Sequence, residues 1–567
     1  MSAPTPPPPA SAAATPAPRH GAARQRPRRR WELWRSPEGQ PPWARPALLG
    51  IAALAGLLYA WNITSSGLAP YYSTAARSMA ESWKAFLFTT LDPAATITLD
   101  KIGGFLWPQA LSARLFGFHA WALTLPQCVE GVISVLVMYR VVRRWQGPAA
   151  GLLAAGMFVL TPIGASMFGH AIPDASLIMC LVLAADRYQW AVRGGRLGSL
   201  LLAGVWVGLG FQAKMMQAWL IVPALAVGYL LAAPVTLRRR LGHLLTAGAV
   251  LGAVSLSWVL MMTFTPKDVR PYVAGTSDNS AFSMVFDYNG FGRFGQPGNG
   301  SGQSDVPIGA APGTGPDAKS GSGGITASDP ENNAPDKLVG TRLVGQIGWL
   351  YPLALLGLAF GLARSRHRPR TDRTRAGYVM WGGWLLTTAA VLSVFPVPHT
   401  AYVAGLAPAL AALGAAGLLA MWRVHRTDRA GRAARAALPA AVALQAAWAG
   451  YLAVGHTGFA PWLTPLVAAA GLLGTAALVL RLRSGRRLLG RLGLAAGCLA
   501  ALAAPATWSL SVLDTRYAGS SFDAHAGPGA TPSQGRLVPS PRSAAQESST
   551  TAEPAGPGPS SGARPHP

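Results

Sequence analysis

An adjacent acid and base, Asp100-Lys101, stand in a connection between hydrophobic stretches of the chain, where charged residues are scarce. A carboxylate can accept a proton from an attacking hydroxyl, and an ammonium beside it can hold a phosphate group. Those are the two tasks of group transfer from a lipid phosphate. An ordinary ion pair at a membrane interface has the same composition, since structural pairs often resemble functional sites. The positions of the other polar residues must therefore decide between the two interpretations.

The composition indicates an integral membrane protein. Half of the residues are hydrophobic and only 12% are charged, whereas about a quarter are charged in a typical soluble domain. The formal net charge is +26, but the basic residues form short clusters between apolar stretches, which argues against nucleic-acid binding. Cys128, Cys180 and Cys498 all lie in apolar runs without metal-ligand spacing, so we predict neither a disulfide framework nor a metal site.

The hydrophobic stretches predict an all-α, polytopic fold with about thirteen transmembrane helices. The connections after the even-numbered spans carry arginine clusters, and the positive-inside rule places these clusters in the cytoplasm. The N-terminus is then cytoplasmic, and the C-terminus and the odd-numbered connections lie outside. The predicted spans are 47–64, 119–141, 148–166, 174–192, 198–213, 216–233, 243–264, 346–363, 377–395, 400–421, 437–455, 461–481 and 491–512.

The chain divides into five predicted parts. Segments rich in Pro and Ala, or in Gly, Ser and Pro, have too little apolar surface to fold and are expected to be disordered. The parts are a disordered basic cytoplasmic tail at 1–45, an N-terminal transmembrane module at 46–264 with its first outer loop at 65–118, a partly disordered outer loop at 265–345, a C-terminal transmembrane module at 346–513, and a disordered outer tail at 514–567.

This topology gathers the ionisable candidates on one membrane face. Asp100 and Lys101 lie in the first outer loop, Asp174 and His399 at the outer ends of two spans, and Lys214 in an outer turn. Charged groups at that depth are costly without partners or water, so their gathering predicts a shared polar cavity. Singly, each has an ordinary explanation, such as an acid that begins its helix or a lysine that reaches the interface.

Aromatic segments flank the predicted cavity. Two amphipathic helices, at Tyr71–Phe88 and Phe105–Phe116, are expected to lie along the interface on either side of the acid-base pair. In the later outer loop, the aromatic run Phe286–Phe294 contains Arg293. Together they are suited to form a platform for a sugar or to cover the site, and packing on the membrane face is an equal alternative.

Long runs of the sequence resemble one family. They resemble, in order, the GT-C membrane glycosyltransferases of the protein-mannosyltransferase and aminoarabinose-transferase superfamily (glycosyltransferase family 39), and especially an actinobacterial YkcB-like branch. The similarity covers most of residues 45 to 525. The runs include Arg77-Ser-Met79, Phe211-Gln-Ala-Lys-Met215, Gln346-Ile-Gly-Trp349 and Leu513-Asp-Thr-Arg-Tyr-Ala-Gly-Ser-Ser-Phe-Asp523.

The resemblance implies an enzyme that takes a sugar from a polyprenyl-phosphate-linked donor. The acceptor, on the outer face of the cytoplasmic membrane, would be a protein, a cell-wall polymer or a lipid. The donor is a substrate, and neither a cofactor nor a metal is predicted. The implied roles are catalytic carboxylates for Asp100 and Asp174, donor phosphate binding for Lys101, Lys214 and Tyr72, and substrate binding for His399 and Tyr402, together with Arg293 from the aromatic run.

Four departures from the family pattern leave alternatives open, and two of them are the turn before Asp174 (Phe168-Gly-His-Ala-Ile-Pro173) and the reduced stretch His399-Thr-Ala-Tyr402. The family's Asp-Lys-Pro-Pro reads Asp100-Lys-Ile-Gly103 here, so a flexible turn is expected, and Ala69-Pro70 stands where relatives carry Asn or an acid. One alternative is a catalytically degenerate paralogue that binds lipid-linked sugar without turnover. Another is a transporter of lipid-linked sugar, which predicts polar residues through the midplane or on both faces. Here the candidates lie on one face.

Overall fold

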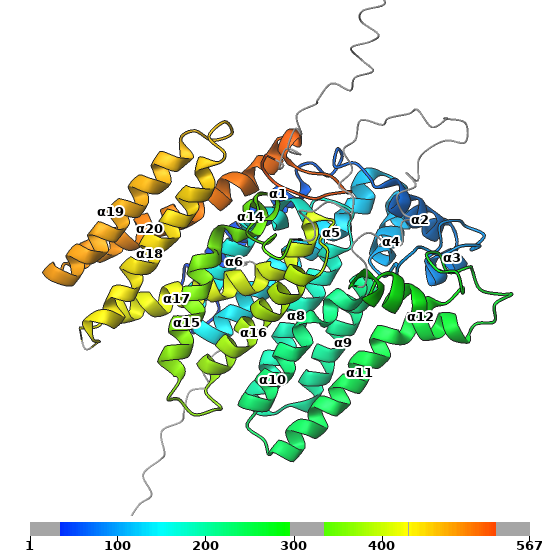
Figure 1. Ribbon diagram of the computed structural model, residues 1–567, viewed down its shortest axis with the longest axis horizontal. Helices are drawn as coiled ribbons and strands as arrows, with labels where there is room; N and C mark the ends of the chain where they lie inside the picture. Colours follow the sequence, from blue (N-terminus) through cyan, green and yellow to red (C-terminus); the bar gives the residue numbers. More distant parts are fainter. Residues whose placement is uncertain (1–33, 295–333, 429, 529–567) are drawn as a thin grey trace, which may run out of the picture.

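The computed structural model describes residues 34–294, 334–428 and 430–528, and the regular elements in these ranges are helices (Figure 1). Most of the predicted N-terminal tail, the middle of the loop at 265–345 and most of the C-terminal tail lie outside the described residues. The predicted all-α class is confirmed.

The helices follow the predicted spans, each of which coincides with one helix or with two consecutive helices. They are α1 (Ala44–Ala60), α2 (Pro70–Glu81), α3 (Trp83–Phe88), α4 (Leu106–Phe116), α5 (Ala120–Gln146), α6 (Pro148–Val159), α7 (Pro162–Met167), α8 (Asp174–Gly194), α9 (Leu197–Lys214), α10 (Val222–Ala232), α11 (Leu237–Phe264), α12 (Ala281–Ser283), α14 (Thr341–Ile347), α15 (Tyr351–Ser365), α16 (Arg373–Val394), α17 (Ala407–His425), α18 (Arg432–Val454), α19 (Leu463–Ser484) and α20 (Arg487–Leu510).

Within the described ranges, nine segments are long and apolar enough to cross a membrane. One of them, Leu197–Ala232, is 36 residues long and contains two predicted spans. Met215 separates these two at a positive φ of 45°, and a 3-10 turn, Met215–Ile221, leads into α10. The helices α1 and α6 are apolar but shorter. The protein is thus a polytopic membrane protein, as predicted.

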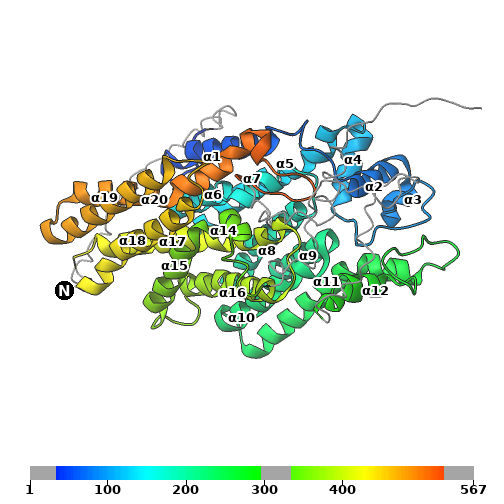
Figure 2. The same cartoon turned by 45° about the horizontal axis from the view of Figure 1, so that its top comes forward.

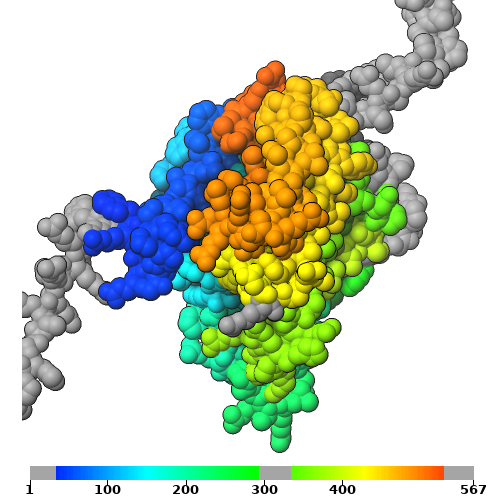
Figure 3. Space-filling model, turned by 90° about the vertical axis from the view of Figure 1, so that its left-hand side faces the viewer, coloured from blue at the N-terminus to red at the C-terminus, as the bar shows by residue number. Residues whose placement is uncertain are grey.

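The helices form a bundle, and α2, α3 and α4 form a separate cap at one corner of it (Figures 1 and 2). In Figures 1 and 2, α18, α19 and α20 lie at one edge of the molecule, and α2, α3 and α4 lie at the opposite edge. Figure 3 shows α19 and α20, in orange, covering one side. One large apolar core runs through the bundle. A smaller apolar cluster under the cap contains Met79, Leu99, Phe105 and, from the end of α9, Ala213. The cap therefore packs directly on α9.

The predicted boundary of the C-terminal tail is wrong for residues 514–528. In this segment Ala524 and Ala526 are buried. The Gln346 side chain accepts a hydrogen bond from the Ala526 amide at 2.9 Å and donates one to the Ala526 carbonyl at 2.8 Å. Small residues let this segment pack closely, and a polar side chain from a distant helix satisfies its backbone, so composition alone suggested disorder.

The predicted boundary of the N-terminal tail is likewise too late in the chain. Residues 34–43 are described, and α1 already begins at Ala44. The Tyr139 hydroxyl donates to the Gln40 side chain at 2.7 Å, which ties this segment to α5.

The crossing of α15 and α17 gives a first test of this packing. A Cβ atom at Gly357 would lie 2.6 Å from the backbone carbonyl oxygen of Leu413, so Gly357→Ala must push the two helices apart. We expect a lower melting temperature in detergent, from a loss of about 1–3 kcal/mol. The control, Gly450→Ala in α18, has nothing within 4 Å of its new Cβ and should not lower it. Equal melting of the two variants would refute the close crossing.

Candidate active site

The first cluster of polar residues consists of Asp100 and Lys101 with two tyrosines from α2. The Lys101 Nζ lies 3.4 Å from the Asp100 carboxylate and donates to the Tyr72 hydroxyl at 3.1 Å. The Asp100 amide donates to the Tyr71 hydroxyl at 2.8 Å. The Tyr72 ring packs edge-on against Phe105, with 5.2 Å between ring centres. The predicted acid-base pair is thus held by two tyrosines of α2, and Phe105, just before α4, supports Tyr72.

Tyr71 stays a neutral phenol in this cluster. Burial, and then the neighbouring Asp100 carboxylate, raise the pKa of the Tyr71 hydroxyl well above its ordinary value. A phenol that keeps its proton adds no negative charge beside the Lys101 ammonium.

The turn after Lys101 is buried rather than flexible, which corrects the expectation from its glycines. Ile102, Gly103 and Gly104 are all buried. The Gly104 amide donates to the Gln212 carbonyl at 3.1 Å, and a Cβ at Gly104 would lie 2.6 Å from that oxygen. Glycine is needed here because two backbones approach closely. This contact joins the first cluster to the end of α9, two residues before Lys214.

The second cluster consists of Asp174, Lys214 and Tyr402. The Lys214 Nζ lies 2.5 Å from the Asp174 carboxylate, and the two side chains are only 10% and 4% exposed. The same ammonium lies 3.8 Å from the centre of the Tyr402 ring, a cation–π contact. The start of α8, the end of α9 and the 3-10 turn Thr400–Leu406 therefore meet at one buried charge pair.

His399 lies beside the second cluster and is positioned by the C-terminal segment. Its ring is stacked with that of Tyr402 at 6.4 Å and meets the edge of Phe522 at 5.2 Å. The Asp523 carboxylate accepts from the Thr400 amide at 2.7 Å and from the Thr400 hydroxyl at 3.0 Å. Asp523 was not among the predicted site residues, although it ends one of the runs that resemble the family.

Arg293 lies in a 3-10 turn, Phe291–Phe294, but its side chain is outside the described part of the structure. The neighbouring segment does reach the first cluster, because the Asn289 side chain donates to the Asp100 carbonyl at 2.6 Å. Contact between this outer loop and Asp100 is therefore present, while the predicted role of Arg293 stays a prediction.

Sequence reasoning missed a buried acid in α5. The Glu130 carboxylate accepts from the Ser176 hydroxyl, at 2.8 Å and 3.0 Å to its two oxygens. Ser176 lies two residues after Asp174, so Glu130 packs against the helix turn that presents the second cluster. An acid in the middle of the predicted span 119–141 was a visible signal, by the rule that intramembrane charge marks function. Among the described residues, no three His, Cys, Asp or Glu side chains are placed to hold a metal ion.

Comparison with known proteins finds relatives in sequence and in fold. A family model, dolichyl-phosphate-mannose-protein mannosyltransferase, matches residues 104–258. The chain is 32% identical over 433 residues to the putative mannosyltransferase YkcB of Bacillus subtilis (strain 168), covering 64% of this chain and 60% of YkcB. Its fold matches the crystal structure of apo ArnT from Cupriavidus metallidurans with a TM-score of 0.50 and 15% identity, over 83% and 77% of the two chains. The chain is thus similar in sequence to a putative mannosyltransferase and similar in fold to apo ArnT.

A further transferase is similar over a shorter stretch. The chain is 30% identical over 233 residues to an undecaprenyl phosphate-alpha-4-amino-4-deoxy-L-arabinose arabinosyl transferase of Pseudomonas fluorescens, covering 38% of each chain. The chain spans about three fifths of the length of the first curated relatives it matches. The matched family model includes Asp174 and Lys214 of the second cluster, ends before Tyr402 and begins just after Lys101.

The buried pair in the second cluster gives a second test. Lys214→Met would leave the Asp174 carboxylate buried without its counter-charge, which costs about 3–5 kcal/mol and should lower the melting temperature in detergent. Adding Asp174→Asn removes the stranded charge, so the double variant should melt higher than the single one.

The exposed pair Arg77–Glu81 is the matched control. Glu81→Gln breaks an ion pair in water and should change stability by no more than about 1 kcal/mol. If Lys214→Met melted like this control, the buried pair would not stabilise the fold.

Proposed function

We propose that this protein is a membrane glycosyltransferase that moves a sugar from a polyprenyl-phosphate-linked donor to an acceptor hydroxyl. The observation that carries the proposal is the pair of carboxylate–lysine contacts, Asp100–Lys101 and Asp174–Lys214, each with a tyrosine at its lysine. The names of the relatives support a polyprenyl-phosphate donor and leave mannose and aminoarabinose as the first sugars to test.

In the proposed reaction the lysines and the carboxylates have separate tasks. The acceptor hydroxyl oxygen bonds to the anomeric carbon of the sugar, and the bond from that carbon to the phosphate oxygen breaks. The bonding electrons leave with the lipid phosphate, whose growing charge is stabilised by Lys101 and Lys214, with Tyr72 as a further donor. The hydroxyl proton passes to a carboxylate.

Asp100 is the better candidate for the general base. Its side chain is 19% exposed, and its carboxylate lies 3.4 Å from the nearest lysine nitrogen. Asp174 is 4% exposed and bonded to Lys214 at 2.5 Å, which suits it to hold that lysine against the donor phosphate. His399, Tyr402 and Arg293 would then contact the sugar or the acceptor. The acceptor is a protein, a cell-wall polymer or a lipid.

The proposed orientation places this site outside the cytoplasm. Arginine clusters lie at the opposite ends of the helices, for example Arg238–Arg240 at the start of α11 and Arg373 at the start of α16. The positive-inside rule puts those ends, and the N-terminus, in the cytoplasm. The C-terminus is then extracytoplasmic.

Cysteine labelling tests the orientation in intact cells. We expect Glu81→Cys, on the exposed face of α2, to react with a membrane-impermeant maleimide without permeabilisation. Arg238→Cys should react only after the membrane is opened. The reverse pattern would place the candidate active site in the cytoplasm and contradict the proposal.

The transfer reaction itself is tested in membranes that contain the protein. With radiolabelled sugar on polyprenyl phosphate, we expect Asp100→Asn to lower turnover by about 10²–10⁴-fold, the usual contribution of a general base. Lys101→Ala should slow turnover as well, through the lost stabilisation of the leaving phosphate. Glu81→Gln, an exposed acid in the same loop, should retain activity at equal expression.

The remaining outcomes separate the alternatives. Loss of turnover in Asp174→Asn but not in Asp100→Asn would make Asp174 the base. Binding of polyprenyl-phosphate sugar without turnover of any donor would support the degenerate paralogue. Movement of the lipid-linked sugar across the membrane, without transfer, would support a transporter.

A further inference from the structure

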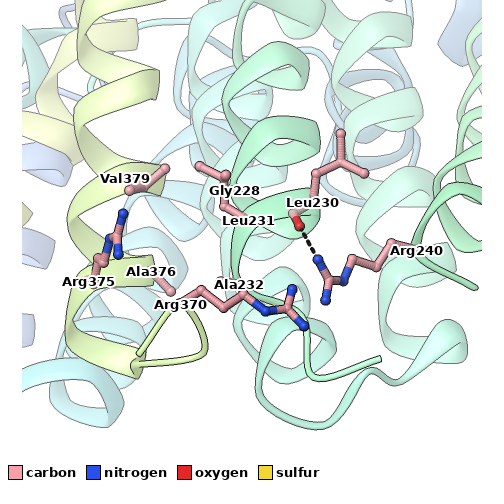
Figure 4. A pocket seen from close by; sticks show the side chains of 9 residues that line it. All are labelled: Gly228, Leu230, Leu231, Ala232, Arg240, Arg370, Arg375, Ala376 and Val379. Carbon is pink, nitrogen blue, oxygen red and sulfur yellow. Dashed lines mark hydrogen bonds between the residues drawn. The ribbon is translucent and has the colours of Figure 1, made fainter. Parts of the chain in front are cut away.

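A basic pocket lies at the end of the bundle away from the candidate active site. It has a volume of about 140 Å³ and lies where the end of α10 meets the starts of α11 and α16 (Figure 4). Three arginines line it, namely Arg240, Arg370 and Arg375, and its other lining residues are apolar or glycine. No acid is among the lining residues, so the pocket carries a concentrated positive charge.

Arg240 is a fixed part of the pocket wall. It is buried, and its guanidinium donates to the Leu230 carbonyl at 2.6 Å and to the Val235 carbonyl at 2.8 Å. These carbonyls lie at and just after the C-terminal end of α10, where the helix dipole favours a cation. The backbone holds the side chain but does not neutralise its unit charge.

Arg370 and Arg375 supply the rest of the positive charge of the pocket. Within the described part of the chain, neither guanidinium makes a hydrogen bond or an ion pair. In Figure 4, the Arg370 side chain extends toward Arg240 beneath the end of α10. The nearest acid in sequence, Asp372, is already engaged, because it accepts from the Arg375 amide at 2.8 Å and pairs with Arg368 at 3.2 Å.

An apolar track leads away from this charge. Leu231 lines the pocket and is exposed, and Val227, one turn earlier on α10, is exposed too. Leu241 and Leu245 continue an exposed apolar stripe on α11. Because these helices cross the membrane, their exposed apolar side chains face lipid. A phospholipid whose phosphate group lay in the pocket would therefore find apolar side chains beside its acyl chains.

We propose that this pocket binds the phosphate group of an anionic phospholipid, with the acyl chains along α10 and α11. Basic pockets between membrane helices are suited to such head groups, since each nearby arginine attracts the negatively charged phosphate. The site is separate from Asp100 and Lys101, and it requires no turnover of any donor.

The full-length protein in detergent, titrated with phosphatidylglycerol and followed by native mass spectrometry, tests the proposal. Wild-type protein should retain phosphatidylglycerol in preference to phosphatidylcholine. Arg370→Ala with Arg375→Ala should weaken phosphatidylglycerol binding by about tenfold or more. The matched control, Arg238→Ala with Arg239→Ala, removes two exposed arginines of α11 outside the pocket and should leave binding within about twofold. If the double variant does not fold, Arg370→Ala alone, at an exposed loop position, should still weaken binding by several-fold.

Three results would overturn the proposal. Equal retention of phosphatidylglycerol and phosphatidylcholine would show that the head-group charge is not recognised. An equal loss of binding in the control would assign the effect to the general charge of this face. Displacement of the lipid by inorganic phosphate at an equal concentration would assign the pocket to a soluble anion.

Discussion

The buried ion pair between Asp174 and Lys214 is the contact on which the arrangement of the candidate active site depends. A charge in an apolar bundle is costly unless a partner meets it at short range, and here the two atoms are 2.5 Å apart. The pair joins the start of α8 to the end of α9, and the Tyr402 ring over Lys214 adds the segment before α17. Moving α8 away from α9 would strand a charge, so the pair fixes the relative position of these two helices.

The first cluster is connected to the helix of this pair by a backbone hydrogen bond and apolar packing rather than by an ion pair. Gly104 donates to Gln212 at the end of α9, and the apolar cluster under α2 and α4 includes Ala213. The position of Lys101 is therefore determined by the helix that ends in Lys214. Two lysines 113 residues apart in sequence thus approach one region because glycine allows two backbones to pack together.

Hydropathy predicted most of the fold because it is a local property, and each span needs only its own residues. The partners of the polar residues were not predictable in this way. Lys214 meets an acid 40 positions earlier, and Thr400 is held by Asp523, 123 positions later. The glycines after Lys101 show the same limit. Their sequence suggests flexibility, whereas their burial comes from a neighbour that no local pattern reveals.

The arginines at the other end of the bundle show that one sequence signal can have several structural causes. As a set they predict topology, yet individually they differ. Arg140, Arg144 and Arg187 surround the buried Asp186, and Arg481 donates to the His425 carbonyl. These side chains stabilise the fold, because each already makes an ion pair or a hydrogen bond within it. Those of Arg370 and Arg375 are not balanced in this way by the described residues, and they line a pocket that opens beside lipid-facing leucines. An arginine whose charge is not paired within the fold can instead bind an anionic ligand.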